Sequence, residues 1–152
     1  MRSERSGFEL ALLLGGAFRA LVDGLHVELA RLGHPHARPL HGFALQAVGP
    51  DGATIAEVGR RLGVSKQAAA KTVAGLEQLG YAIREANPAD GRAVHVRRSV
   101  RGEELLALSA QTFDRMRTAW MEEIGSDRFD ALEDDLARVA GGKLGDFPGW
   151  LR

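Results

Sequence analysis

One segment near the middle of the chain constrains the fold most, because it encodes two helices separated by a very short turn. Thr54 and Glu57 have the spacing of a capping box, in which both side chains accept hydrogen bonds from backbone amides at a helix start. That helix is predicted to end at Gly63. Ser65 is suited to cap a second helix that runs to about Gly80. The sequence therefore predicts a tight helical pair here.

Small residues stand at the two positions where a helix-turn-helix needs them. Gly59 is placed where the first helix passes close to the second, and Gly63 supplies a left-handed backbone in the turn. An apolar seam is predicted to join the two helices, formed by Val58, Leu62, Val64, Ala69, Val73 and Leu76. An ordinary helical hairpin inside a core is the alternative interpretation.

The second helix of this pair has a polar face opposite its apolar seam, since successive residues are rotated by about 100°. The Gln67 amide can read adenine, and the Lys71 ammonium can reach guanine or a phosphate. Ser65 and Lys66 lie at the helix N-terminus, where backbone amides favour phosphate. The candidate DNA contacts on this helix are Ser65, Lys66, Gln67, Ala70 and Lys71.

A β-hairpin is predicted after the second helix. Residues 81–86 and 93–98 show strand-like alternation, with Val94 and Val96 on one face, and residues 87–92 contain the Asn-Pro-Ala-Asp-Gly-Arg pattern of a hairpin tip. After a helix-turn-helix such a hairpin is a wing, whose arginines can approach a DNA backbone or minor groove. The candidates are Arg84, Arg92, Arg97 and Arg98, with Asp90 orienting Arg92 or shaping the turn.

The charge distribution places the basic residues where DNA contact is predicted. The 152 residues carry 20 basic and 20 acidic side chains. Residues 60–101 nevertheless hold nine basic and three acidic side chains, whereas residues 102–152 hold six and eleven. This is the layout of a module that contacts phosphate while its remainder does not. A randomly uneven solvated surface is the alternative.

Long apolar-striped helices are predicted at both ends, over residues 7–33 and 100–141. Pro35 and Pro39 separate the first of them from a short helix carrying residues 40–48. The terminal helices offer more apolar surface than a monomer of this size readily buries, and one helix-turn-helix reads only one half-site. A twofold homodimer answers both problems.

These features together resemble the MarR family of multiple-antibiotic-resistance-type regulators. The resemblance covers nearly the full length, and its most specific parts are the helix-turn-helix entry at residues 54–65, the Leu-Glu-Gln-Leu-Gly-Tyr exit at 76–81 and the Asp-Gly-Arg wing tip at 90–92. It implies a homodimer that binds a pseudo-palindromic operator and releases it on binding a small aromatic or anionic ligand. Arg98-Ser99 departs from the usual leucine-threonine, and Gly75 replaces a larger residue.

The predicted architecture is a single chain over residues 1–152, mainly α with a small β-hairpin wing. Residues 36–99 are expected to form the winged helix-turn-helix lobe, and residues 7–33 and 100–141 the dimerisation helices. The family resemblance implies an effector pocket between the first, second and penultimate helices, with ordinary core packing as the alternative for its residues. The candidates are Phe18, His41, Leu45, Met116 and Trp120.

Other function classes receive little support from the sequence. The chain has no cysteine, no phosphate-binding glycine loop, no Gly-x-Ser-x-Gly elbow and no His-Glu-x-x-His pair, so neither an enzyme nor a cofactor is predicted. His34, His36 and His41 lack the spacing of a metal site. No signal peptide or membrane span is expected, which favours the cytoplasm. The remaining alternative is a winged-helix module that binds a ligand or protein but not DNA.

Overall fold

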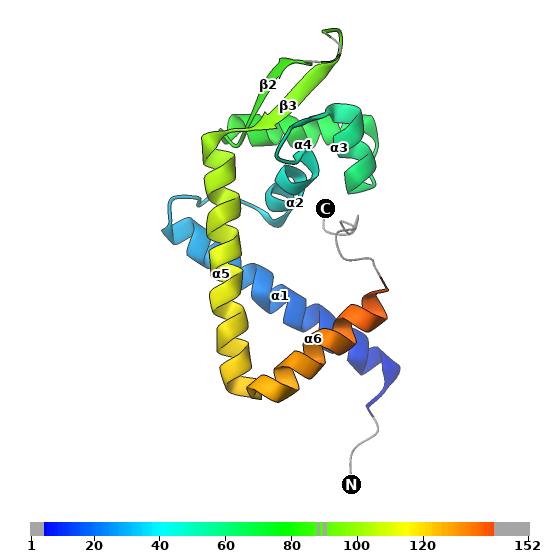
Figure 1. Ribbon diagram of the computed structural model, residues 1–152, viewed down its shortest axis with the longest axis vertical. Coiled ribbons are helices and arrows are strands. Elements are labelled where there is room, and N and C mark those ends of the chain that lie inside the picture. Colours follow the sequence, from blue (N-terminus) through cyan, green and yellow to red (C-terminus); the bar gives the residue numbers. More distant parts are fainter. Residues whose placement is uncertain (1–4, 88, 90, 142–152) are drawn as a thin grey trace.

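The computed structural model describes residues 5–87, 89 and 91–141, and within them it contains six helices and a three-stranded antiparallel sheet (Figure 1). The mainly α fold with a hairpin wing, predicted from the sequence, is confirmed. The elements in chain order are α1 (Gly7–Arg31), α2 (Pro39–Val48), β1 (Ala53–Thr54), α3 (Ile55–Leu62), α4 (Lys66–Gln78), β2 (Ala82–Ala86), β3 (Val94–Arg98), α5 (Val100–Ile124) and α6 (Ser126–Ala140).

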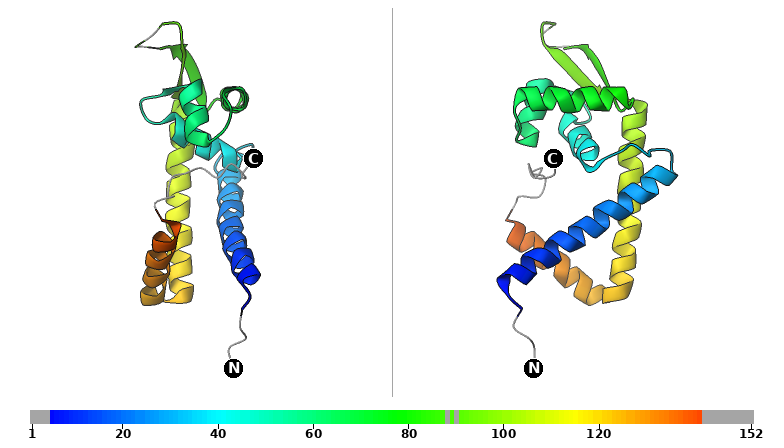
Figure 2. Two further views of the ribbon diagram at one scale, coloured as in Figure 1. Left: turned by 90° about the vertical axis from the view of Figure 1, so that its right-hand side faces the viewer. Right: turned by 180° about the vertical axis from the view of Figure 1, so that it is seen from behind.

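The molecule has a globular lobe at one end and extended helices at the other. Helices α2, α3 and α4 pack under the β2–β3 hairpin, and α5 runs from the base of this hairpin away from the lobe (Figure 1). Helix α6 turns back from the far end of α5. In the edge-on view, α1 lies in one layer and α5 with α6 in another (Figure 2). The two layers meet where α1 crosses α5 near the lobe.

The capping residues predicted from the sequence begin the helices as expected. The Thr54 hydroxyl accepts the Glu57 amide proton at 3.2 Å, and the Thr54 amide donates to the Glu57 carboxylate at 2.7 Å. The Ser65 and Ser99 hydroxyls cap α4 and α5 by accepting the amide protons of Ala68 and Gly102. Helix α6 differs slightly, because Gly125 is its N-cap and no side chain caps it.

The turn between α3 and α4 has the geometry that its glycines predicted. Gly63 has a φ of 66°, in the left-handed region that favours glycine. At Gly59 a Cβ atom would lie 3.1 Å from the carbonyl oxygen of Val64, tighter than an ordinary contact. The two glycines therefore set the distance and the angle between the helices of the pair.

One apolar core lies inside the lobe and extends to the ends of α1 and α5 that adjoin it. Leu25 and Leu29 at the end of α1, Leu45 and Val48 in α2 and Leu105 in α5 are all buried in it. The predicted seam of α3 and α4 joins the same core, with Val58, Leu62, Ala69, Val73 and Leu76 buried and Val64 packed at its edge.

The sheet contains a strand that the sequence analysis missed. Strand β1 is only two residues long and pairs with β3, with Ala53 opposite Val96. The order in the sheet is β1-β3-β2. Val96 is fully buried as predicted, whereas Val94 is exposed because it lies toward the hairpin tip, beyond the reach of the core. Asp90 and the apolar tail at Phe147, Pro148 and Trp150 fall outside the described residues.

Helix α1 leaves the core halfway along its length. Residues 5–17 are exposed on every side of the helix, and the Gly15-Gly16 pair has no other atom within reach of an added Cβ. By length and apolar composition alone, α1 could also cross a membrane, a criterion that core helices of soluble proteins and signal sequences satisfy too. The ion pair between Arg19 and Asp23 lies in the middle of this helix. The apolar half of α1 is thus without cover in a single chain.

Candidate nucleic-acid interface

The outer face of α4 is the first part of the candidate interface. Lys66, Gln67 and Lys71 are exposed on it, while the seam on the opposite side of the helix is buried. Ala70 is half-buried and packs against the core, so only part of its methyl group is accessible. The helix therefore presents an amide and two ammonium groups, with no bulky apolar residue between them.

The N-terminus of α4 adds a site suited to phosphate. The Ser65 hydroxyl accepts the Ala68 amide proton at 3.1 Å and can still donate its own proton outward. The first amides of a 13-residue helix point in the same direction. Lys66 brings a positive charge to this end of the helix, so an anion would meet both a charge and oriented amides.

The wing arginines are held by carboxylates. The Arg84 Nε atom lies 2.8 and 2.9 Å from the two carboxylate oxygens of Glu77, which ties β2 to the last turn of α4. Arg97 lies 3.6 Å from a carboxylate oxygen of Glu85 on the paired strand. Arg92 is exposed next to the tip of the hairpin. Arg84 and Arg97 thus position the wing, and their charge is partly offset locally.

Arg98, which departs from the family pattern, has a structural role. Its Nε atom donates to the carbonyl oxygen of Leu45 at 2.8 Å, and its guanidinium lies 3.5 Å from Glu103. Arg61 donates to the carbonyl oxygen of Ala47 at 2.7 Å. Both arginines thus satisfy carbonyl groups in the last turn of α2. They connect α2 to the helix-turn-helix and to the base of the wing.

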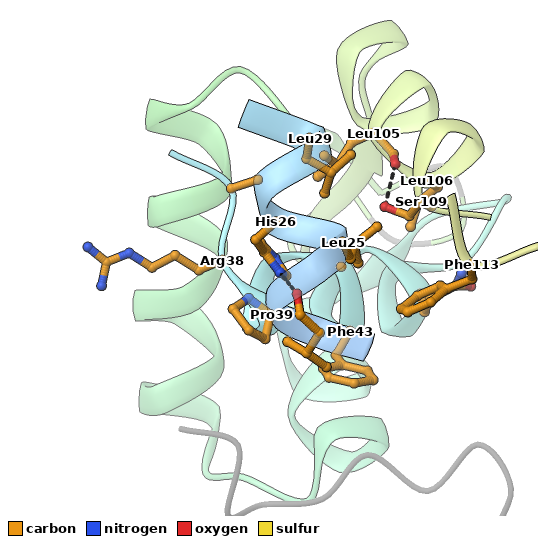
Figure 3. A pocket seen from close by; sticks show the side chains of 14 residues that line it. Leu25, His26, Leu29, Arg38, Pro39, Phe43, Leu105, Leu106, Ser109 and Phe113 are labelled. Carbon is orange, nitrogen blue, oxygen red and sulfur yellow. Dashed lines mark hydrogen bonds between the residues drawn. The ribbon is translucent and has the colours of Figure 1, made fainter. Parts of the chain in front are cut away.

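A cavity of about 160 Å³ lies between α1, α2 and α5 (Figure 3). Most of its wall is apolar, and its position agrees with the effector pocket that the family resemblance implies. It is lined by Val22, Leu25, His26, Leu29, Ala37, Arg38, Pro39, Gly42, Phe43, Gln46, Leu105, Leu106, Ser109 and Phe113.

Two polar side chains that line this cavity already make hydrogen bonds to backbone carbonyl groups. The His26 Nδ1 atom lies 2.7 Å from the carbonyl oxygen of Val22, and Ser109 donates to the carbonyl oxygen of Leu105 at 2.7 Å. Because a carbonyl oxygen can only accept, Nδ1 of His26 carries a proton. The Arg38 guanidinium points away from the other lining side chains (Figure 3). Gln46 also lines the cavity, and its amide can both donate and accept, so the wall is mainly apolar with a few polar groups.

The cavity is lined by residues other than the five expected from the resemblance, which were Phe18, His41, Leu45, Met116 and Trp120. Leu45 is fully buried in the core, and Met116 packs so closely on Gly24 that a Cβ there would lie 2.6 Å from its Cε. Phe43 and Phe113 could have been found from the apolar stripes to which they belong. His26 gives no such signal in the sequence.

The histidines do not gather into a metal site. Within the part of the chain that the structure describes, no group of three or more side chains of the metal-binding types could hold an ion. His34 is buried, whereas His36 is exposed. His41 accepts the Arg38 amide proton on Nδ1 at 3.0 Å and so caps α2.

Replacing Gly75 by alanine is expected to stabilise helix α4. The glycine lies inside α4, and an added Cβ would have no atom within 4 Å. Alanine favours a helix interior over glycine by about 1 kcal/mol, so the free energy of unfolding should rise by about 0.5–1 kcal/mol. Urea denaturation followed by circular dichroism measures this change. A loss of stability would show that α4 packs differently.

Residues 42–93, which span most of α2, the helix-turn-helix and the wing as far as the start of β3, match the model of the MarR family. No curated protein matches the chain. The matched segment contains all but two of the predicted DNA contacts, since Arg97 and Arg98 lie just beyond it.

Solved structures share the fold over most of the chain. Streptococcus pneumoniae FabT in complex with DNA is 18% identical, with a TM-score of 0.72, and the alignment covers 88% of this chain and 94% of FabT. A MarR-family transcriptional regulator from a Rhodococcus species is 18% identical, with a TM-score of 0.65 and coverages of 91% and 97%. CouR from Rhodococcus jostii, bound to p-coumaroyl-CoA, is 18% identical, with a TM-score of 0.64 and coverages of 92% and 97%.

The matched segment and the overall architecture agree with each other. The family model covers the helix-turn-helix, and the solved structures also include the long helices on either side. Residues 42–93 of this chain therefore resemble the MarR family, and the chain as a whole has the winged helix-turn-helix fold of these structures.

Proposed function

We propose that this protein is a sequence-specific DNA-binding transcription regulator that reads double-stranded DNA with α4 and its wing. The observation that carries the proposal is the exposed face of α4, where Gln67 and Lys71 stand beside a capped helix N-terminus. An amide and an ammonium on a slim helix suit the major groove. The likeness to FabT, whose structure contains DNA, supports DNA binding by this fold. This role involves no catalysis and fits a cytoplasmic location.

We propose further that the protein acts as a homodimer through the helices that leave the lobe, those of residues 7–33 and 100–141. The N-terminal half of α1 exposes Phe8, Leu10 and Leu14, and α6 exposes Val139. In the edge-on view, α1 and α6 lie in separate layers, so α6 does not cover α1 (Figure 2). A second copy would bury both surfaces and place two α4 helices for two half-sites.

The dimer proposal predicts the effect of placing charge on this surface. Leu10 and Leu14 are one turn apart, and the double replacement Leu10→Glu and Leu14→Glu would bury carboxylates at a twofold interface. The dissociation constant of the dimer is expected to rise by at least about 100-fold, because each buried leucine contributes about 1.5–3 kcal/mol. Sedimentation velocity measures the change. Ile83→Glu, at an exposed apolar position on strand β2 and outside the proposed dimerisation helices, is the control.

Two outcomes would contradict the dimer. A wild-type protein that sediments as a monomer at micromolar concentration would show that the surface has another use. Recovery of the wild-type protein in the membrane fraction would instead assign α1 to a bilayer, which its length and composition permit.

We propose that a small ligand binds in the cavity between α1, α2 and α5 and releases the protein from DNA, so that the protein acts as a repressor. The apolar wall favours an aromatic or similarly apolar compound. Arg38 points away from the cavity, so its guanidinium is not placed to meet an anionic group of the ligand (Figure 3). The likeness to CouR, whose structure holds p-coumaroyl-CoA, supports ligand binding by this fold.

A winged-helix module that does not bind DNA is the second candidate. It is favoured by the pairing of Arg84 and Arg97 with carboxylates, which lowers the charge that the wing offers to phosphate. The two candidates differ in what charge reversal on α4 and the wing would do.

A binding titration tests the proposed function. Purified protein is titrated with the DNA upstream of its own gene and with unrelated DNA of equal length, at 50 and 200 mM salt. We expect tighter binding to its own upstream DNA and a loss of about 1,000-fold in affinity at the higher salt, because several phosphates are contacted. Absence of binding to either DNA at both salt concentrations would favour the second candidate.

A further inference from the structure

Tyr81 lies at the point where the recognition helix passes into the wing. It stands between α4 and β2, and its side chain is only 1% exposed. Its amide donates to the carbonyl oxygen of Leu76 at 2.8 Å, and its carbonyl oxygen accepts the Ser99 amide proton at 3.0 Å. A displacement of Tyr81 would therefore move α4, the wing and the start of α5 relative to each other.

Two histidines and an arginine surround the Tyr81 ring. The His34 Nδ1 atom lies 2.9 Å from the Tyr81 hydroxyl oxygen, and the ring centroid of His41 lies 6.3 Å from that of Tyr81. The Arg101 guanidinium stands 5.2 Å from the centroid of the tyrosine ring. Arg101 also donates to the carbonyl oxygen of Gly33 at 3.0 Å. The segment between α1 and α2 is thus fastened to the recognition helix at this junction.

Burial at His34 and hydrogen bonding at His41 favour the neutral form of each histidine. A Glu104 carboxylate oxygen lies 3.5 Å from Nε2 of His34, which favours the tautomer protonated on Nε2. The Tyr81 hydroxyl then donates to the free Nδ1. His41 uses its own Nδ1 to accept the Arg38 amide proton. A proton added to Nδ1 of His41 would remove the acceptor of the Arg38 amide, and a proton added to His34 would place a charge at a buried site.

Burial and the neighbouring cations lower the pKa of both histidines, whereas one carboxylate opposes them at His34. Burial lowers the pKa of His34, and the positive charge of Arg101 lowers it further, while Glu104 raises it. Burial lowers the pKa of His41, with smaller effects from Arg38 and His26. Since both folded-state pKa values lie below the ordinary value of about 6.5, the stabilisation is complete above that pH. It is lost as the pH falls from about 6.5 toward the lowered values.

We propose that His34 and His41 form a proton-sensitive junction that holds α4 and the wing in position at neutral pH and releases them on acidification. In the closed junction each histidine stays neutral, whereas in the open junction it titrates at the ordinary value of about 6.5. At pH 5.5 each histidine therefore shifts the equilibrium toward the open junction by about tenfold. The two together shift it by up to about 100-fold. The effect of the junction on DNA binding rests on the proposed function. The opening of the junction itself does not, because it occurs with or without DNA.

Amide hydrogen exchange, corrected for intrinsic rates, tests the junction without DNA. The protection factor of the Ser99 amide, which donates to Tyr81, is expected to fall by about tenfold per histidine between pH 7.5 and 5.5. The double variant His34→Gln and His41→Gln keeps acceptors at both positions but cannot be protonated, so its protection should stay constant. The exposed His36 provides the control His36→Gln, which should behave as the wild type.

Two results would overturn the junction. One is equal loss of protection in the wild type and in the double glutamine variant. The other concerns Glu104→Gln, an exposed change that removes the carboxylate favouring protonated His34 in the closed state. This change should make the loss of Ser99 protection at pH 5.0 larger than in the wild type. A dependence of protection on pH identical to that of the wild type would contradict the assigned contacts.

DNA affinity over the same pH range gives a second readout with a distinctive sign. A protein gains positive charge on acidification, which by itself strengthens binding to DNA. The junction predicts weaker binding at pH 5.5 in the wild type and not in the double glutamine variant. If no DNA binds at any pH while protection of Ser99 still falls, the proposed function fails and the junction stands.

Discussion

Replacing Gly102 by alanine is expected to lower the free energy of unfolding by about 3 kcal/mol or more. Gly102 is buried in the first turn of α5, and an added Cβ would overlap the carbonyl oxygen of Tyr81. It would also lie 3.3 Å from the Leu45 Cδ2 atom. Neither the backbone of Tyr81 nor a core leucine can move freely, since the Ser99 amide donates to the same carbonyl oxygen. The start of α5 must therefore shift away from the lobe.

Thermal unfolding measures this effect, and a fall in the melting temperature of about 6–12 °C is expected for a chain of this size. Gly75→Ala is the matched control, because it makes the same substitution in a helix where an added Cβ has open space. Equal melting temperatures for Gly102→Ala and the wild type would contradict the packing of α5 against Tyr81.

Reversing the charge of Lys71 and Arg92 together is expected to weaken binding to the operator by about 100-fold or more. Lys71 lies on the exposed face of α4, and Arg92 is exposed next to the tip of the wing. Each lost contact to a base edge or phosphate costs about 1–3 kcal/mol, and a carboxylate in its place adds repulsion. Every 1.4 kcal/mol is a factor of about ten in the dissociation constant, so the expected loss is far larger than the error of a binding titration.

The control for this double reversal is Arg128→Glu, at an exposed position on α6 far from the lobe. It changes charge in the same direction, so general repulsion of DNA would affect both proteins. Circular dichroism and sedimentation should be unchanged in either variant. Wild-type affinity in the Lys71→Glu and Arg92→Glu protein would exclude α4 and the wing as the DNA-contacting surface.

Local chemistry made the helix-turn-helix predictable. The capping box of Thr54 and Glu57 and the left-handed Gly63 depend on residues within a few positions of each other. The same holds for the cap at Ser65 and the buried seam of α4. Each signal specifies a backbone conformation nearby, so helix starts, the turn and the buried face follow directly from the sequence.

Contacts between distant parts of the chain could not be predicted from the sequence. Arg98 and Leu45 are 53 positions apart, and nothing near either residue indicates that they share a hydrogen bond. The pairing of Arg84 with Glu77, the close approach of Gly102 to Tyr81 and the short strand β1 depend on tertiary packing in the same way. The cavity illustrates the limit: its position follows from the family resemblance, but its lining depends on how far each helix is rotated.

Selection from a random pool of double-stranded DNA tests the central claim most directly, because it does not depend on knowing the target. A dimer that reads two half-sites with α4 should enrich an inverted repeat whose half-sites are about 10 base pairs apart, or a multiple of that spacing. The Lys71→Glu and Arg92→Glu protein, selected in parallel, should enrich nothing. A wild-type pool that remains random after repeated rounds would contradict the account of this protein as a sequence-specific regulator.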